Sequence, residues 1–153
     1  MKVLMIIPAY NEEESILNTV MSIVEYRKKV DFDLDYVVIN DGSVDRTKEI
    51  LDSHHLNAIH LVMNLGIGGA VQTGYKYALE KDYDVAVQFD GDGQHDIESL
   101  DALLEPIRRQ QADLVVGSRF IGDKASEFQT TFMRRFGITI ISAFIKLTTG
   151  KRI

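Results

Sequence analysis

Apolar runs that alternate with amphipathic segments restrict the fold of this chain more than any other feature of its sequence. Runs typical of strands buried on both faces occur at 3–7, 36–39 and 85–89, with a shorter fourth case at 114–116. Apolar residues at helical spacing lie between them, at 16–24, 50–51, 70–79 and 100–107. The alternation predicts an α/β fold, in which helices flank both faces of a mainly parallel sheet.

Polar residues mark where three of the helices are expected to begin. The candidates are Asn11, which precedes the acidic residues 12–14, and Asp45 and Asp96, each shortly before a helical pattern. Small polar side chains favour the position before a helix, and acidic ones favour its first turn, because both complement free backbone N–H groups. We therefore predict helices that start after these three residues.

Length and composition indicate a single domain over residues 1–153. With 153 residues and 45% hydrophobic content, the chain supports one continuous core. It has no cysteine, which excludes disulfides and thiolate metal sites and fits a reducing compartment. The apolar start is shorter than that of a signal peptide, and the apolar stretch 132–147 is shorter than the roughly 20 residues of a spanning helix. We therefore predict a cytoplasmic protein that does not cross a bilayer.

The charge of the chain is divided unevenly. Residues 1–115 carry 10 Lys and Arg against 21 Asp and Glu, whereas residues 116–153 carry 7 against 2. An acidic body disfavours contact with nucleic-acid phosphates, so we expect no nucleic-acid partner. The basic end favours a phosphate-bearing partner or an anionic membrane surface, although charges that are simply solvated explain it equally well.

Polar residues gather in the loops that follow the predicted strands. In a parallel sheet the carboxyl ends of the strands meet at one edge, and ligands bind there. The loops at this edge are 8–12, 40–43, 90–95 and 117–119. We therefore expect the functional site at the carboxyl edge of the sheet.

Two aspartates flank a glycine directly after the run 85–89. Alternate side chains of an extended segment leave its same side, so Asp90 and Asp92 lie about 7 Å apart and repel one another unless a cation joins them. Oxygen ligands of this kind suit Mg2+ or Mn2+, and Gln94 offers a neutral third oxygen. The sequence predicts a divalent metal site here; the alternative is a turn rich in Asp and Gly that binds nothing.

Three further positions are candidates for contact with a nucleotide. The carboxylate of Asp41 is suited to accept hydrogen bonds from a base or ribose, or else it forms a turn or caps a helix. Tyr10 stacks on a base or is an exposed turn residue. The glycines at 66–69, with Gly69 as the candidate, precede an amphipathic helix, so they either allow close backbone approach or contact phosphate directly.

Histidine contributes little to the predicted chemistry. His54, His55 and His60 have no acidic or histidine partner at metal-ligand spacing, so we assign them surface or core roles. His95 lies inside the acidic loop and is the one histidine retained as a candidate for the site.

Five motifs, taken in order, resemble those of family 2 glycosyltransferases, and most closely the branch of dolichyl- and polyprenyl-phosphate mannose synthases. They are Pro8-Ala9-Tyr10-Asn11-Glu12, Asp41-Gly42-Ser43 with Asp45, Asn64-Leu65-Gly66 with Gly69 and Ala70, Asp90-Gly91-Asp92-Gly93-Gln94-His95, and Gly117-Ser118-Arg119. Together they cover most of residues 3–119, which makes them far more specific than any single motif. The resemblance implies the Rossmann-like GT-A fold and an inverting transfer of sugar from a UDP- or GDP-linked donor.

The resemblance also implies roles for individual residues. Pro8, Ala9, Tyr10, Glu12, Asp41, Gly69 and Asp90-Gly91-Asp92 map onto the nucleotide-sugar site, Asp90, Asp92 and Gln94 onto the metal site, and Arg119, Arg134 and Arg135 onto arginines that hold the acceptor phosphate. Asp90, Asp92 and Arg119 are the candidate catalytic residues. A polyprenyl phosphate acceptor is already an anion at neutral pH, because the second pKa of a phosphate monoester is about 6, and it therefore needs no general base.

The sequences of this family normally continue beyond a segment such as 149–153, so we expect an acceptor side that is incomplete in this chain. The segment 130–149 is then either a core helix whose cover is missing or an amphipathic helix on the cytosolic surface of a membrane. Its exposed apolar surface favours self-association into a homo-oligomer.

Two other functions compete with the transferase. A sugar-1-phosphate nucleotidyltransferase shares the sheet and the metal chemistry, but it needs a glycine-rich basic loop after the first strand, and residues 8–14 provide neither feature. A non-catalytic nucleotide-sugar-binding or scaffold fragment also fits an incomplete acceptor side. Metal-dependent binding without hydrolysis or transfer would favour the scaffold.

Overall fold

The computed structural model describes residues 1–90 and 97–117, and the chain forms two compact units, 1–102 and 103–153. Each unit is considered by itself. Several predictions concern residues outside the described ranges: the loop residues Gly91, Asp92, Gln94, His95 and Asp96, the arginines Arg119, Arg134 and Arg135, and the helix at 130–149. They stay predictions, as does the single domain over 1–153.

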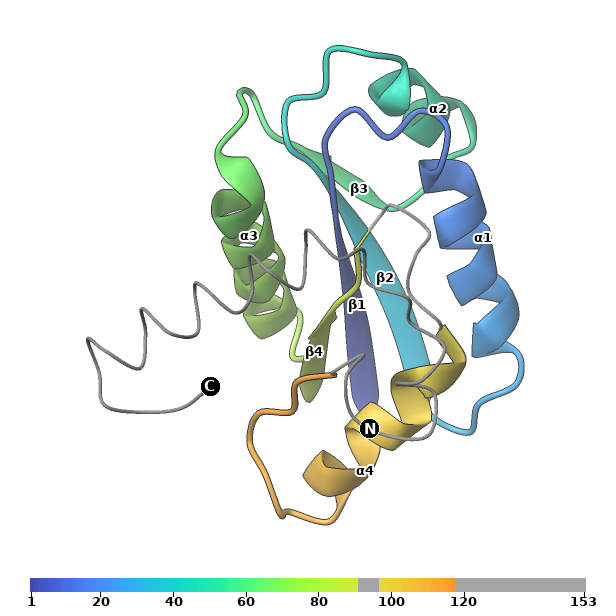
Figure 1. The fold of residues 1–153 in the computed structure, drawn as a ribbon, viewed down its shortest axis with the longest axis vertical. Helices are drawn as coiled ribbons and strands as arrows, with labels where there is room; N and C mark the ends of the chain where they lie inside the picture. Colours follow the sequence, from blue (N-terminus) through green and yellow to red (C-terminus); the bar gives the residue numbers. More distant parts are fainter. Residues whose placement is uncertain (91–96, 118–153) are drawn as a thin grey trace, which may run out of the picture. The chain divides into compact units, whose positions relative to one another are not determined.

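The first unit is built on a four-stranded parallel sheet with the order β3-β2-β1-β4 (Figure 1). Its strands are β1 (Lys2–Ala9), β2 (Asp33–Asn40), β3 (Ala58–His60) and β4 (Val85–Gln88). The strands predicted at 3–7, 36–39 and 85–89 are confirmed. The sequence pattern does not predict β3, because 3 residues are too few to show a period.

The prediction of a fourth strand at 114–116 is wrong. Residues 114–117 have no regular secondary structure, and Leu114 and Val116 are each 79% exposed. An apolar run becomes a strand only when a neighbouring strand takes up its backbone hydrogen bonds, and the described part of the second unit contains no such neighbour. The local pattern carries no information about whether that neighbour exists.

Helices cover both faces of the sheet, so the predicted fold class is confirmed. They are α1 (Ile16–Arg27), α2 (Thr47–Ser53) and α3 (Gly66–Glu80). The short 3-10 helix η1 (Ile97–Ser99) and α4 (Leu100–Arg108) follow along the chain, and the boundary between the two units falls within α4. α1 and α3 lie on opposite faces of the sheet (Figure 1). None of the helices in the described ranges has the length and apolar content that a bilayer crossing requires.

The predicted helix starts are partly wrong. α1 begins after its N-cap residue Ser15, several residues beyond Asn11. Asn11 instead has a left-handed backbone, with φ of 57°, and its Oδ1 accepts a hydrogen bond from the N–H of Val44 at 2.9 Å. Asp45 does stand at the start of α2, where its Oδ1 accepts a hydrogen bond from the N–H of Thr47 at 2.9 Å. Asn11 therefore joins two loops rather than capping a helix.

The core lies between the sheet and its helices. Residues 3–7 of β1 are fully buried, and alternate residues of β1 and β2 pack against α3. That cluster contains Leu4, Ile6, Val37, Ile39, Ala70 and Ala78. β4 is only half-buried, contrary to the expectation for 85–89, because among the described strands it has β1 as its one neighbour.

We expect Gly74→Ala to destabilise the protein by about 1–3 kcal/mol, the usual effect of overpacking a core. Gly74 is buried on α3, and an added Cβ would collide with the side chain of Ile6, which full burial in β1 holds in place. The matched control is Gly68→Ala on the same helix, where nothing lies within 4 Å of the added carbon. This control should be neutral or stabilise by up to about 1 kcal/mol. Urea denaturation measures both variants, and equal stability would contradict the close approach of α3 to β1.

Candidate functional site

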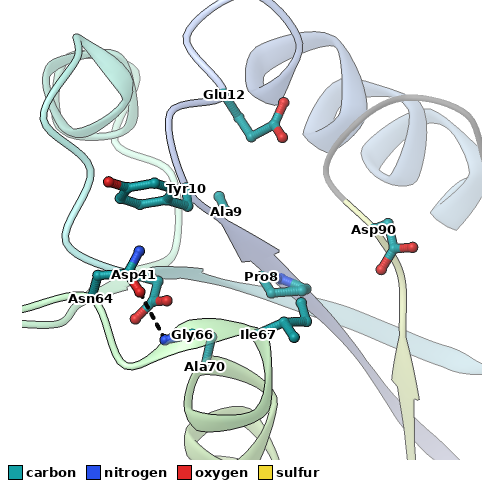
Figure 2. Close-up of a pocket in the computed structure, with 10 residues that line it drawn as sticks. All are labelled: Pro8, Ala9, Tyr10, Glu12, Asp41, Asn64, Gly66, Ile67, Ala70 and Asp90. Atoms are coloured by element: carbon teal, nitrogen blue, oxygen red, sulfur yellow. Dashed lines mark hydrogen bonds between the residues drawn. The ribbon is translucent and has the colours of Figure 1, made fainter.

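A pocket of about 430 Å³ lies in the first unit at the carboxyl edge of the sheet (Figure 2). Its lining consists of Pro8, Ala9, Tyr10, Glu12, Asp41, Asn64, Gly66, Ile67, Ala70 and Asp90. Of the predicted site residues that the structure describes, all except Gly69 are in this lining. The expectation that the loops at this edge converge on one site therefore agrees with the observed pocket.

The pocket lies where the order of the strands reverses. β1 has β2 on one side and β4 on the other, and the chain passes through β2 and β3 before it returns to β4. The connection from β1 to β2 runs through α1 on one face of the sheet, and the connection from β3 to β4 runs through α3 on the opposite face, which leaves a crevice at the carboxyl ends of the strands. In open parallel sheets this reversal point is the usual place for a bound ligand.

Hydrogen bonds join the loop after β1 to the loop after β2. The N–H of Glu12 donates to Thr47 Oγ1 at 2.8 Å, and the N–H of Glu13 donates to Asp45 Oδ2 at 3.1 Å. Partial burial acts to raise the pKa of Asp45, but hydrogen bonds from Thr47 and from the backbone of Glu13 outweigh it and hold this pKa below its ordinary value. Asp45 is therefore an anion that fastens the two pocket loops to each other.

Asp41 is the most buried polar residue of the lining, with 3% of its surface exposed. Its Oδ1 accepts a hydrogen bond from the N–H of Leu65 at 2.7 Å, and its own N–H donates to the carbonyl oxygen of Ala9 at 2.9 Å. One carboxylate oxygen thus holds the residue before α3. The alternative role predicted for Asp41, a turn made by its own side chain, is filled by Asn40, whose Oδ1 accepts from the N–H of Ser43 at 3.1 Å.

Sequence reasoning missed Asn40, which is buried, with 2% of its surface exposed. An Asn three residues before a Ser is a recognised turn pattern, so a signal was present in the sequence. Asn40 falls in the predicted loop 40–43 but is assigned no role there, because Asp41 beside it is the stronger ligand candidate. The turn that presents Asp41 is therefore organised by its neighbour.

Gly42 lets this turn approach the segment before α3. Its φ is 67°, in the left-handed region, and an added Cβ would lie 2.7 Å from both the backbone N of Asn64 and the backbone C of Met63. Any side chain at this position would push the two segments apart. The glycine in the second motif therefore brings Asn64 beside Asp41 in the pocket wall.

Two of the glycines at the start of α3 have contacts within the protein. Gly66 is in the pocket lining, but its N–H donates to Asn64 Oδ1 at 2.9 Å (Figure 2). Gly69 is outside the lining, and an added Cβ there would lie 2.5 Å from the Cβ of Leu65. The small size of Gly69 therefore serves packing within the first turn of α3.

Tyr10 and Glu12 extend the pocket beyond the end of β1. Tyr10 is 46% exposed, and its ring lies on the same side of the pocket as Asp41 and Asn64 (Figure 2). The carboxylate of Glu12 accepts a hydrogen bond from Ser15 Oγ at 2.5 Å, which ties it to the start of α1. A partly exposed aromatic ring near a buried acceptor suits a planar, polar ligand group.

Asp90 lines the pocket from the side opposite Asp41 (Figure 2). Its Oδ1 accepts a hydrogen bond from Gln88 Nε2 at 3.2 Å. In residues 1–90 and 97–117, no three His, Cys, Asp or Glu side chains form a metal-binding group. The predicted partners Asp92 and Gln94 lie outside those ranges, so Asp90 is the member of the predicted metal site that the structure describes. Its carboxylate oxygens are ligands of the kind that Mg2+ and Mn2+ prefer.

His60 has an acidic partner that the spacing of residues in the sequence does not reveal. Its Nε2 lies 3.0 Å from Asp52 Oδ1, and its Nδ1 lies 3.0 Å from Asn40 Nδ2. Asp52 precedes His60 by 8 residues, which is no ligand spacing, and the connection from α2 to β3 brings them together. The imidazole, which belongs to the last residue of β3, therefore links α2 to the end of β2.

A comparison with known families decides which class of protein this fold and pocket belong to. The model of the family described as "Glycosyl transferase family 2" matches residues 5–150. The chain belongs to this family. The resemblance that was inferred from the five motifs is confirmed, and the match favours a glycosyltransferase over the nucleotidyltransferase alternative.

Two curated relatives illustrate the similarity. The chain is 38% identical over 137 residues to an undecaprenyl-phosphate mannosyltransferase of Micrococcus luteus, which covers 86% of this chain and 54% of the relative. It is 34% identical over 137 residues to a UDP-N-acetylglucosamine–dolichyl-phosphate N-acetylglucosaminyltransferase of Methanococcus voltae, which covers 78% of this chain and 53% of the relative. The chain therefore spans about half the length of the curated relatives it matches.

Solved structures share the fold. Glucosyl-3-phosphoglycerate synthase of Mycobacterium tuberculosis in complex with Mn2+ and UDP-glucose matches with a TM-score of 0.54 and 21% identity, over 69% of this chain and 39% of that one. S. aureus TarS 1–349 matches with a TM-score of 0.50 and 26% identity, over 74% of this chain and 34% of that one. These neighbours are GT-A glycosyltransferases, so the predicted GT-A fold is confirmed.

Proposed function

We propose that this chain forms the nucleotide-sugar-binding part of an inverting glycosyltransferase with a UDP- or GDP-linked donor and a polyprenyl phosphate acceptor. One observation carries the proposal: a single pocket at the reversal point of the sheet contains residues 8–10, Glu12, Asp41 and Asp90. The names of the Micrococcus and Methanococcus relatives include lipid-phosphate acceptors, and that of the second includes a UDP-linked sugar.

The nucleoside of the donor occupies the side of the pocket that Tyr10, Asp41 and Asn64 form. The Tyr10 ring covers one face of the base, and the carboxylate of Asp41 accepts a hydrogen bond from the base or ribose. Because Asp41 is almost fully buried, a hydrogen bond to its charge is stronger than it would be in water. The volume of about 430 Å³ is in the range of pockets for ligands of this size.

The diphosphate of the donor extends toward Asp90. Residues 1–115 carry 21 acidic side chains against 10 basic ones, so they repel a diphosphate unless a cation intervenes. Asp90, together with Asp92 and Gln94 of the same loop, would hold Mg2+ or Mn2+ through oxygen atoms. When bound, the ion neutralises the diphosphate and stabilises it as a leaving group. The Mycobacterium neighbour, which shares the fold, was solved with Mn2+ and UDP-glucose.

The acceptor approaches from the basic part of the chain. Arg119, Arg134 and Arg135 would orient the lipid phosphate through bidentate contacts, and its anionic oxygen attacks the anomeric carbon opposite the leaving diphosphate. Attack from that side inverts the anomeric centre, and no general base is needed because the phosphate is already ionised. The protein would act in the cytoplasm at the membrane surface, with the segment 130–149 as its contact with the lipid or with a second copy.

Calorimetric titration of the 153-residue chain with UDP and with GDP, each with Mn2+ and with EDTA, tests the proposal. We expect one nucleotide to bind at least about 10-fold more tightly, and only when the metal is present. A transfer assay with the matching nucleotide sugar and a short polyprenyl phosphate then follows. Metal-dependent binding without hydrolysis or transfer would favour the non-catalytic scaffold, and affinity that is independent of metal would refute the proposed site.

A further inference from the structure

We propose that His60 is a positioning residue for the turn that carries Asp41, and that it acts through the side-chain amide of Asn40. The inference rests on the proposed function, which assigns Asp41 to the nucleotide. His60 itself is not in the pocket lining, so it has no direct contact with a ligand bound there. Its effect on binding is transmitted through hydrogen bonds.

Asn40 holds the turn at three points. Its side-chain Oδ1 accepts from the N–H of Ser43 at 3.1 Å, and its carbonyl oxygen accepts from the N–H of Gly42 and from the N–H of Leu61, each at 2.9 Å. The first two bonds close the turn around Asp41, and the third fastens it to the segment that leads into α3. Because Asn40 is 2% exposed, water does not replace any of these bonds if one is lost.

His60 fixes which way the Asn40 amide points. Asn40 and His60 are directly opposite one another in the parallel pairing of β2 with β3, and Asn40 Nδ2 lies 3.0 Å from His60 Nδ1. The amide oxygen is committed to the N–H of Ser43, so the amide nitrogen faces the ring and must donate to it. Nδ1 of His60 is therefore an acceptor and carries no hydrogen.

The other ring nitrogen leads to the same assignment. Nε2 of His60 lies 3.0 Å from Asp52 Oδ1, and an ionised carboxylate only accepts hydrogen bonds. Nε2 must therefore carry the hydrogen and donate it to Asp52. The contacts at both ring nitrogens therefore favour the same neutral tautomer, with its proton on Nε2. In this form His60 donates to Asp52 and accepts from Asn40.

Loss of the acceptor at Nδ1 would leave the buried Asn40 Nδ2 without its partner. The amide then either keeps an unsatisfied N–H group or rotates, and rotation would place its NH2 group against the N–H of Ser43. Both outcomes loosen the turn, and with it the hold of Asp41 Oδ1 on the N–H of Leu65. Asp52, His60, Asn40 and Ser43 are therefore joined in series by hydrogen bonds that lead from α2 to the turn that carries Asp41.

Three variants test this role. His60→Phe keeps a ring of similar size but offers no acceptor, and we expect it to weaken Mn2+-dependent binding of the nucleotide by about 10-fold, as for one lost hydrogen bond to a buried amide. His60→Gln restores both bonds, because its Oε1 accepts from Asn40 while its Nε2 donates to Asp52, and it should bind within about 2-fold of the original chain. The matched control is His54→Phe, at the exposed end of α2, which should leave binding unchanged.

Nuclear magnetic resonance separates this inference from the proposed function, because it needs no ligand. Long-range 1H–15N spectra should show the Nε2-protonated tautomer for His60, and the amide of Ser43 should exchange faster in His60→Phe but not in His60→Gln. If the original chain binds neither nucleotide, the proposed function fails while these spectra still decide the role of His60. A proton on Nδ1, unchanged exchange at Ser43 in His60→Phe, or equal nucleotide affinity of His60→Phe and a binding-competent original chain would overturn the inference.

Discussion

Asp90→Ala is expected to raise the Kd for a nucleoside diphosphate in Mn2+ by at least about 100-fold, more than the 10- to 100-fold typical of groups that only support a metal ligand. Asp90 lines the pocket after β4 and supplies carboxylate oxygens on the side opposite Asp41. In the proposed site it is a direct ligand, so its loss removes both a metal contact and the charge that retains the ion.

The same variant should behave differently in EDTA. Without metal, Asp90 only repels the diphosphate, so Asp90→Ala should bind as weakly as the original chain or slightly better. Asp84→Ala is the matched control, because it makes the same change in net charge just before the amino end of β4, where Asp84 Oδ2 accepts a hydrogen bond from the N–H of Lys2. Calorimetry on all three proteins provides the comparison. A loss of affinity that is equal with Mn2+ and with EDTA would show that Asp90 contacts the ligand without a metal.

Asp41→Asn is expected to weaken nucleotide binding by about 10- to 100-fold while the protein stays folded. The asparagine Oδ1 can still accept from the N–H of Leu65, so the contact that holds the start of α3 is kept. The second carboxylate oxygen becomes an NH2 group, which donates and cannot accept from a base or ribose. A hydrogen bond to a charged group is worth about 1.5–3 kcal/mol, which corresponds to the expected loss of affinity.

The direction of the Asp41→Asn effect distinguishes a specific contact from general electrostatics. Removing a negative charge from an acidic chain should by itself strengthen the binding of an anion. Asp33→Asn, at the amino end of the same strand, makes that change away from the pocket and should leave affinity the same or slightly higher. Thermal denaturation should place the melting temperature of Asp41→Asn close to that of the original chain. If Asp41→Asn binds as tightly as Asp33→Asn, then Asp41 serves only to hold Leu65.

The two variants address opposite sides of one pocket, and their combined result locates the ligand. Loss of affinity in Asp41→Asn alone indicates that the nucleoside is recognised but that no metal bridges the diphosphate. Loss in Asp90→Ala alone indicates that the metal–diphosphate contact dominates and that Asp41 is structural. The proposed function requires both losses in Mn2+, and it requires that the original chain itself bind the nucleotide only weakly in EDTA.

Several features could be predicted because they depend on residues close together in the chain. The apolar runs at 3–7, 36–39 and 85–89 predict β1, β2 and β4, since a strand buried between helices has to be apolar on both faces. The polar loops that follow them predict a site at the carboxyl edge, and Asp41 and Asp90 do meet in one pocket there. Parallel strands separated by helices leave few other arrangements.

The errors and omissions arise where a residue's role depends on a distant partner. The run at 114–116 has the composition of a strand but, in the described residues, no strand beside it. Asn11 has the chemistry of a helix cap, yet its acceptor is used by the N–H of Val44 in another loop. His60 lacks any partner at ligand spacing, yet Asp52 and Asn40 lie against its two ring nitrogens. A hydrogen-bonding side chain is suited to many partners, and local sequence does not select among them.

The sequence by itself determined the fold class, the family and the edge of the sheet at which the pocket lies, because the periods of apolar residues and the order of the motifs are properties of the chain. Only the tertiary structure decided that Asn40 rather than Asp41 closes the turn, that Gly42 brings residues 63–64 against it, and that Asp45 ties the two pocket loops together. The contacts of Gly42 and Asp45 join segments that lie far apart in the chain, and the local sequence offers both Asn40 and Asp41 to the turn, so in each case the partners that folding places together and removes from water decide the outcome.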